Sequence, residues 1–142
     1  MSSDETAIPS ETQDQFEHLL SAAVEFAHKT ITKYGSFQPF VISVGLDGKE
    51  AMGMADPGGA GLPLDQLDLL QDGLIARRDD MQAYAIAVDV RIASLGSDAI
   101  EVRMARFDGS AVTANIPYKV KRFRRGVELG ELITREGEHL VW

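Results

Sequence analysis

The sequence predicts an α+β fold in which two helices pack against a central antiparallel sheet, in two layers. Three patterns indicate this fold: a one-sided apolar stripe at helical spacing near the N-terminus, an early strand-turn-strand segment, and alternating apolar residues over 83–120 that predict a three-stranded β-meander. The expected order is α-β-β-α-β-β-β with one or two C-terminal strands. Residues 1–9 are expected to form a flexible tail and residues 10–142 a single domain, which suits a chain of 142 residues.

The first helix is expected to run from Ser10 to Tyr34. Ser10 and Gln13 fit a capping box at its start, and Gly35 fits a C-terminal cap. An apolar stripe on one side of this helix is expected to be buried against the sheet. It comprises Phe16, Leu19, Leu20, Ala23, Val24, Ala27 and Ile31.

Two strands are expected between the helices, over Val41 to Gly45 and Lys49 to Met54. The residues between them, Leu46 to Gly48, fit a type I turn that ends on a left-handed glycine. A loop rich in glycine and proline over 56–63 then leads to a second helix, over about Leu64 to Arg78.

The register of the meander follows if each strand has one buried face. Facing strands then pair even positions with even positions, which sets Val90 opposite Val102. One face of the sheet then carries a charged square that consists of Asp89, Arg91, Glu101 and Arg103.

The second turn of the meander, Phe107 to Gly109, fits a three-residue loop with a left-handed glycine. Such a loop sets Met104 opposite Val112 and Ile100 opposite Ile116. Beyond the meander, residues 126–130 are expected to form a connection. Residues 132–133 are then expected to pair with residues 140–142.

Composition and charge exclude several classes of protein. The formal net charge of −8 disfavours a general role on nucleic acid or anionic membranes. The absence of cysteine excludes disulfides and thiolate metal sites. The apolar stretches are too short to span a bilayer and the acidic N-terminus is unlike a signal peptide, so a cytoplasmic location is expected.

The segment Tyr34-Gly35-Ser36-Phe37-Gln38-Pro39-Phe40, with the strand and Asp-Gly turn after it, resembles a pattern in small uncharacterised bacterial proteins. Asp98 to Val102 and Pro117-Tyr118 fit the same pattern. The element order is also similar to that of profilin-like and roadblock-like domains, although those folds end in a helix and this chain is expected to end in strands. These resemblances imply a bacterial protein and a topology, and no activity.

Six residues are candidate ligand contacts. Tyr34, Phe37 and Phe40 lie at a helix-to-strand junction, where aromatic residues form either a structural corner or the wall of a small-ligand or peptide pocket. The other three come from the charged square: Arg91, Glu101 and Arg103. A carboxylate beside arginines can hold a polar ligand, and the alternatives are a solvated salt-bridge ladder or a polar subunit interface.

A basic run near the C-terminus is a candidate interaction site. It comprises Lys119, Lys121, Arg122, Phe123, Arg124 and Arg125. Cations around an aromatic residue can bind single-stranded nucleic acid, yet the chain is acidic overall, so nucleic acid is disfavoured. The alternatives are a guard on a strand edge or a contact for an acidic protein, including the acidic half of a second copy. Residues 1–75 carry a net charge of −9 and residues 76–142 of +1.

No catalytic, metal or cofactor motif is visible. The glycines at 58, 59 and 61 lack the rest of a phosphate-binding loop and fit a flexible connector. The three histidines, His18, His28 and His139, show no metal-ligand spacing, and no serine lies in a GxSxG elbow. No cofactor and no metal are therefore expected.

The sequence thus predicts a protein-interaction or small-ligand-binding module without enzymatic activity, which self-associates as a homodimer or binds an acidic protein. Two alternatives stay open. One is an enzyme whose site is assembled from dispersed strand residues, and the other is a nucleic-acid-associated protein that uses the basic run.

Overall fold

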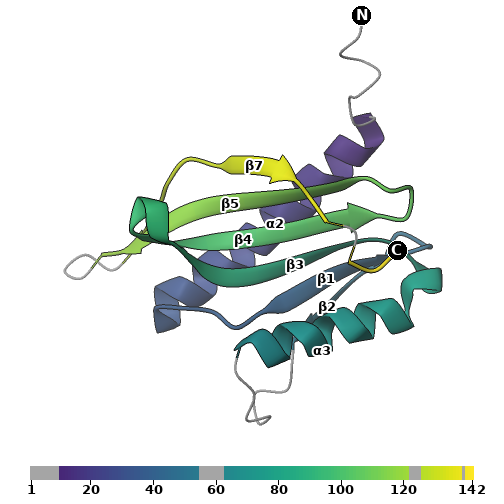
Figure 1. Cartoon of the computed structure of the whole chain (residues 1–142), viewed down its shortest axis with the longest axis horizontal. Coiled ribbons are helices and arrows are strands. Elements are labelled where there is room, and N and C mark those ends of the chain that lie inside the picture. The colour runs from purple at the N-terminus through teal and green to yellow at the C-terminus, as the bar shows by residue number, and fades with distance from the viewer. Residues whose placement is uncertain (1–9, 55–62, 122–125, 139) are drawn as a thin grey trace, which may run out of the picture.

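The computed structural model describes residues 10–54, 63–121, 126–138 and 140–142. These residues form two long helices and a seven-stranded antiparallel sheet (Figure 1). The elements are α2 (Ser10–Tyr34), β1 (Phe40–Gly45), β2 (Glu50–Met54), α3 (Pro63–Ala76), β3 (Met81–Ile92), β4 (Ser97–Arg106), β5 (Ala111–Val120), β6 (Val127–Leu129) and β7 (Ile133–Glu136). The predicted α+β class and element order are confirmed, with two C-terminal strands. None of the described helices combines the length and apolarity needed to cross a membrane.

Helix α2 has the bounds that its caps and stripe predict. Its last turn closes on Gly35, whose φ of 84° is left-handed and whose N–H donates to the Ile31 carbonyl at 2.7 Å. The middle of the stripe is fully buried, but Leu20 and Val24 at its margin are only partly buried. Small residues lie at the centre of the stripe and on the strand below it, which allows the helix to approach the sheet closely. They are Ala23 and Ala27 on α2, and Ala83, Ala85 and Ala87 on β3.

The strands follow the order β2-β1-β3-β4-β5-β6, and β7 pairs with the other part of β5. Both predicted glycine turns are confirmed, because Gly48 and Gly109 have φ values of 83° and 95°. At the second turn the Arg106 N–H donates to the Ser110 carbonyl at 2.9 Å. That turn sets Met104 opposite Val112 and Ile100 opposite Ile116, as expected.

The predicted register between β3 and β4 is wrong. Val90 lies opposite Ala99, and Val102 lies opposite Ala87. The connection is a short 3-10 turn, Ala93–Leu95, followed by a left-handed Gly96, and this four-residue loop pairs even positions with odd ones. The bulky side chains of β3 therefore face away from those of β4.

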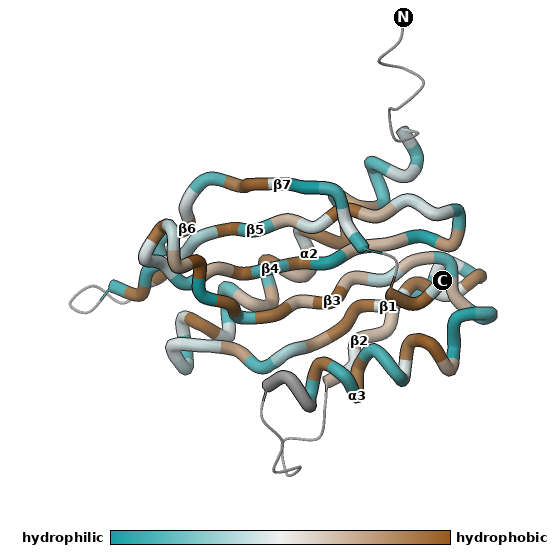
Figure 2. The backbone as a smooth tube through the Cα atoms, in the orientation of Figure 1, coloured by the Kyte–Doolittle hydropathy of each residue, from teal (hydrophilic) through white to brown (hydrophobic). Residues whose placement is uncertain are grey.

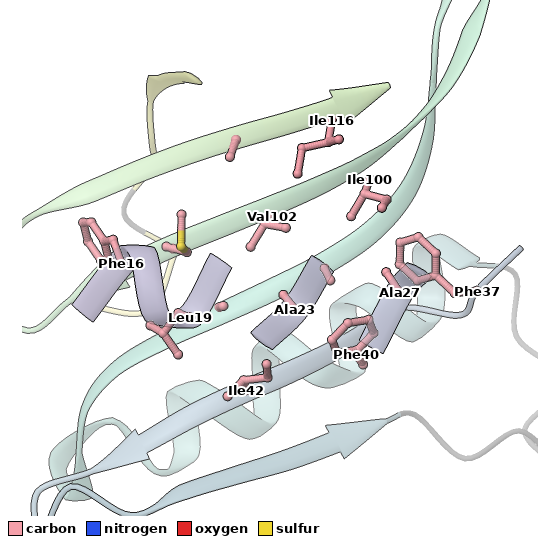
Figure 3. Close-up of a cluster of buried hydrophobic side chains, with 14 of the residues drawn as sticks. Phe16, Leu19, Ala23, Ala27, Phe37, Phe40, Ile42, Ile100, Val102 and Ile116 are labelled. Atoms are coloured by element: carbon pink, nitrogen blue, oxygen red, sulfur yellow. The ribbon is translucent and has the colours of Figure 1, made fainter. Parts of the chain in front are cut away.

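Two cores on opposite faces of the sheet explain this register. The first lies between α2 and the sheet (Figure 3) and contains the apolar residues of β4 at 100, 102 and 104. The second contains Tyr84, Ile86 and Val88 of β3, with Leu67, Leu70 and Leu74 of α3. Figure 1 shows α2 behind the sheet and α3 in front of it, near the edge formed by β1 and β2. The assumption of one buried face fails because both faces of β3 are covered, so the helices and the sheet form three layers rather than the predicted two.

Hydropathy follows the same division (Figure 2). The strands in the middle of the sheet are largely hydrophobic, whereas α3 alternates between hydrophobic and hydrophilic turns. A sheet that is covered on both faces needs apolar side chains on both, which the continuous burial of β1 from Phe40 to Val44 illustrates.

The C-terminal strands pair differently from the prediction. Val127–Leu129, expected in a connection, forms β6 on β5, and Ile133–Glu136 forms β7 on the same strand. Residues 140–142 form no strand and cross to the second core instead. Trp142 stacks on Tyr84 with ring centroids 5.6 Å apart, and its Nε1–H donates to the Arg78 carbonyl at 3.2 Å. The predicted hairpin was wrong because these apolar residues complete a core rather than a strand pair.

Candidate functional site

A notch lies at one end of the sheet, where β3 extends beyond the start of its neighbour β1. Strand β1 begins with Phe40 opposite Ala87, while β3 continues to Ile92. The segment over residues 35–39 crosses this notch on its way from α2 to β1. Figure 1 shows the C-terminal end of α2, this segment and the first turn of α3 at the same end of the sheet.

Aromatic packing holds the crossing segment in place. Phe37 is buried and meets the buried Phe40 edge-on at 5.8 Å, and Phe40 meets Phe26 of α2 at 4.8 Å. Figure 3 shows Phe37 and Phe40 together at the end of the first core where α2 terminates. Because buried aromatic rings in such contacts are rigid, the segment has a defined path over the notch.

The notch opens into a hollow of about 700 Å³, hereafter the α2-end hollow. Its described lining consists of Thr30, Tyr34, Ser36, Phe37, Gln38, Pro39, Met54, Gln66, Val88 and Asp89. These residues come from α2, the crossing segment, β2, α3 and β3. Five of these ten side chains are apolar or aromatic and five are polar, and the volume lies in the range of small-molecule sites.

Asp89 is the one charged side chain in that described lining. Its Oδ1 accepts a hydrogen bond from the Tyr118 hydroxyl at 2.7 Å, and its Oδ2 accepts one from the Phe37 N–H at 3.4 Å. Burial raises the pKa of Asp89 above its ordinary value, and these two hydrogen bonds offset part of that rise. Burial and the neighbouring Asp89 carboxylate likewise raise the pKa of Tyr118, so Tyr118 acts as a hydrogen-bond donor.

The predicted ligand contacts separate into three places. Tyr34 and Phe37 line the α2-end hollow, and Phe40 lies beneath it in the first core. Arg91 lies opposite Asp98 on β4, and its Nη1 reaches the Asp98 carboxylate at 3.5 Å. Glu101 and Arg103 share the strand face of Ala99 and Ala105, opposite the face of the first core.

The predicted charged square is therefore not formed. Since the loop between β3 and β4 shifts the register by one residue, Asp89 faces Ile100 rather than Arg103. Glu101 is 7% exposed and is held by two arginines instead: Arg103 at 2.8 Å and Arg135 of β7 at 3.0 Å. This cluster joins β7 to β4 across β5, which is a structural role.

The basic run falls largely outside the described residues, since Arg122, Phe123, Arg124 and Arg125 are not among them. Lys119 and Lys121 are exposed where β5 ends. The Lys121 N–H donates to the Gly126 carbonyl at 3.1 Å, just before β6 begins.

Of the histidines, His18 contacts Glu50 at 2.8 Å, and His28 lines a shallow groove beside α2. His139 lies outside the described residues. Within the part of the chain that the structure describes, no three His, Asp or Glu side chains lie close enough together to hold a metal ion. The described lining of the α2-end hollow offers one carboxylate, which is too few ligands for a metal.

Sequence reasoning missed Asp89 and its partner Tyr118 as a pair. One signal was available: odd positions of β3 are alanine at 83, 85 and 87, and Asp89 interrupts that small, buried series. The contact itself depends on two strand registers, because Tyr118 lies two strands away on β5.

Comparisons of this chain with protein-family models, with curated proteins and with solved structures find no match. The chemistry of the α2-end hollow therefore has to be inferred from its own residues.

Proposed function

We propose that the protein is a small-ligand-binding module of the cytoplasm that acts without chemistry of its own. The observation that carries this proposal is the α2-end hollow, which combines apolar walls with one partly buried carboxylate. Concave sites with a few converging polar groups and a shifted pKa are the usual places where proteins bind small molecules.

The construction of the hollow supports the same function. Six of its ten described lining residues belong to helices and strands, and the aromatic contacts of Phe37 and Phe40 fix the segment that supplies the other four. A pre-formed site loses little conformational entropy when a ligand binds, which favours affinity.

Filling the hollow tests the proposal. Thr30 lines it, whereas Thr32 lies on the same helix outside the lining. The two residues are matched, because each hydroxyl donates to the carbonyl four residues earlier, at 2.9 Å for Thr30 and 2.7 Å for Thr32. Compounds from a fragment library that raise the melting temperature of the wild type should do so for Thr32→Trp and not for Thr30→Trp.

Amide chemical shifts measured by NMR locate the binding of the same compounds. The expected perturbations are at Thr30, Gln66 and Val88. The proposal is wrong if the compounds stabilise both tryptophan variants equally, or if their perturbations lie elsewhere on the protein.

A second candidate function is self-association through β2. All but one of its residues are exposed, and Met52 and Met54 present apolar side chains at a sheet edge. An edge strand without lysine or proline within it is open to pairing with another strand. The expected readout is a dimer mass in solution, which substitutions of Met52 should abolish.

A further inference from the structure

We propose that the α2-end hollow selects organic cations, such as an amine with an apolar body, whose charged nitrogen binds Asp89. This inference rests on the proposed function and specifies the ligand class. It starts from the charge of the lining, in which Asp89 is the one charged side chain among the described residues. Among the described lining residues an anionic ligand would meet a carboxylate and no cation, and Lys33 lies outside that lining, over the Tyr34 ring at the mouth.

The carboxylate of Asp89 is oriented without being neutralised. Its two partners, the Tyr118 hydroxyl and the Phe37 N–H, are both uncharged donors. In the described part of the chain no lysine or arginine forms an ion pair with Asp89. Arg91, two residues further along β3, pairs with Asp98 at 3.5 Å and donates to the Gly96 carbonyl at 3.4 Å. A ligand cation would supply the missing counter-charge.

The aromatic wall suits the same class of ligand. The Tyr34 ring is 69% exposed at the mouth of the hollow, and the Lys33 ammonium already lies 5.2 Å from its centroid. The face of this ring is thus placed where a cation can approach it, and a ligand cation there would take the place of Lys33. An organic cation could therefore meet Asp89 with its nitrogen while its apolar body contacts Met54, Val88 and the ring.

Desolvation adds to the preference for a cation. The titratable or charged groups on the elements around Asp89 are Tyr118 on β5, Asp98 on β4, Arg91 on β3, and Lys33 and Tyr34 of α2. A bound cation stabilises the ionised carboxylate, which burial disfavours, so binding should release protons in the pH range where Asp89 is partly protonated. A neutral ligand gives no such proton release.

Three probes of one shape but different charge separate these cases: 2-phenylethylamine, 2-phenylethanol and 3-phenylpropionate. With the full chain at neutral pH, the amine should bind about tenfold or more tighter than the alcohol, and the carboxylate should be weakest. Isothermal titration gives the affinities, and amide shifts at Thr30, Gln66 and Val88 place the probe in the hollow.

Two variants assign the effect to Asp89. Asp89→Asn should weaken binding of the amine about tenfold and leave the affinity for the alcohol unchanged. Asp72→Asn removes the same charge from an exposed position on α3 and should change neither affinity. If Asp89→Asn does not fold, the same test can be made with the wild type at a series of pH values. Its affinity for the amine should fall on acidification, because Asp89 becomes protonated, while its affinity for the alcohol should stay constant.

The outcomes are distinguishable. If the alcohol binds in the hollow as tightly as the amine, or if Asp89→Asn leaves the affinity for the amine unchanged, the cation inference is overturned and the small-ligand function stands. If none of the three probes perturbs the hollow at millimolar concentration, the inference and the proposed function both fail.

Discussion

A partly buried carboxylate that only neutral donors hold is a costly group in a folded protein. Asp89 occupies the position of β3 where the preceding residues of the same face are alanines. Desolvation raises its pKa despite the hydrogen bonds from Tyr118 and Phe37, so the ionised form is less favourable in the folded chain than in the unfolded one. A residue kept at a cost to stability is a candidate for function.

The pH dependence of stability tests this reading of Asp89. Because its pKa is raised in the folded state, Asp89 destabilises the fold little below its unfolded pKa and increasingly as pH rises through its folded pKa. Asp89→Asn does not titrate, so its stability relative to the wild type should increase from acid to neutral pH. Urea unfolding at a series of pH values measures this difference. A difference that is constant or falls with pH would contradict it, and Asp72→Asn is the control for net charge.

Burial along α2 gives a second prediction at this scale. Leu19 is 0% exposed in the first core (Figure 3), whereas its neighbour Leu20 is only partly buried against that core. Leu19→Ala should cost about 2–5 kcal/mol of unfolding free energy, and Leu20→Ala clearly less, because less apolar surface and a smaller cavity are involved. Chemical denaturation of both variants measures the two losses. Equal losses would show that the helix is rotated relative to the structure described above.

At the scale of elements, short sequence patterns predicted the helices and turns that depend on neighbouring residues. The stripe and caps predict α2, and the two Asp-Gly turns predict the β1–β2 and β4–β5 hairpins. The β3–β4 register was not predictable from alternation, because α3 covers the second face of β3 and removes the reason for a shared apolar face. The two lining residues that were predicted, Tyr34 and Phe37, likewise come from one local segment of the sequence.

The remainder of the site depends on contacts between distant residues. Asp89 and Tyr118 meet only because three strands pair in a particular register. Gln66 reaches the hollow because α3 lies on the opposite face from α2, and Met54 does so because it pairs with Phe40 where β1 begins. Periodicity along one chain carries no information on either arrangement.

Replacing either of two glycines with alanine should change the stability of the fold, in opposite directions. A Cβ on Gly137, just after β7, would lie 2.7 Å from the Val112 nitrogen and 2.8 Å from the Ala111 carbonyl carbon, both in the backbone of β5. Gly137→Ala should therefore destabilise the fold by about 1–3 kcal/mol. Gly73 lies inside α3 with no atom within 4 Å of such a Cβ, so Gly73→Ala should stabilise by about 0.5–1 kcal/mol.

Fluorescence of Trp142, the single tryptophan, follows unfolding of both variants because this residue stacks on Tyr84. A neutral Gly137→Ala would mean that the chain after β7 does not lie against β5. Failure of Gly73→Ala to stabilise would indicate that α3 has contacts on the side where the structure leaves Gly73 open.

At the scale of the whole molecule, charge and sheet edges decide how copies could associate. The acidic first half and the near-neutral second half of the sequence do not form separate surfaces, because α2 packs onto β3, β4 and β5. Acidic and basic residues that are separated along the sequence are therefore mixed on the folded protein. This weakens the case for association of copies by charge alone. The far strand β7 carries Arg135 and Glu136, whereas β2 carries no charge between Ala51 and Met54.

If two copies pair through β2, the position of an added charge along β2 should decide whether the dimer forms. Association driven by net charge has no such dependence. In an antiparallel pair centred on Met52, this residue faces its own copy, Ala51 faces Gly53, and Glu50 faces Met54, so no like charges meet. Met52→Lys sets two lysines opposite each other and should give a monomer, while Met54→Lys sets a lysine opposite Glu50 and should keep the dimer. Both variants add the same charge.

Light scattering at low and high salt measures the masses of the wild type and the two variants. Pairing of backbones should persist at high salt, whereas ion pairing between copies should weaken as the ionic strength rises. Replacing Lys119 and Lys121 with serine should leave the β2 dimer intact. A wild type that is monomeric at every concentration rejects self-association, and a dimer that dissociates equally in both lysine variants, or that depends on Lys119 and Lys121, points to charge pairing instead of the β2 edge.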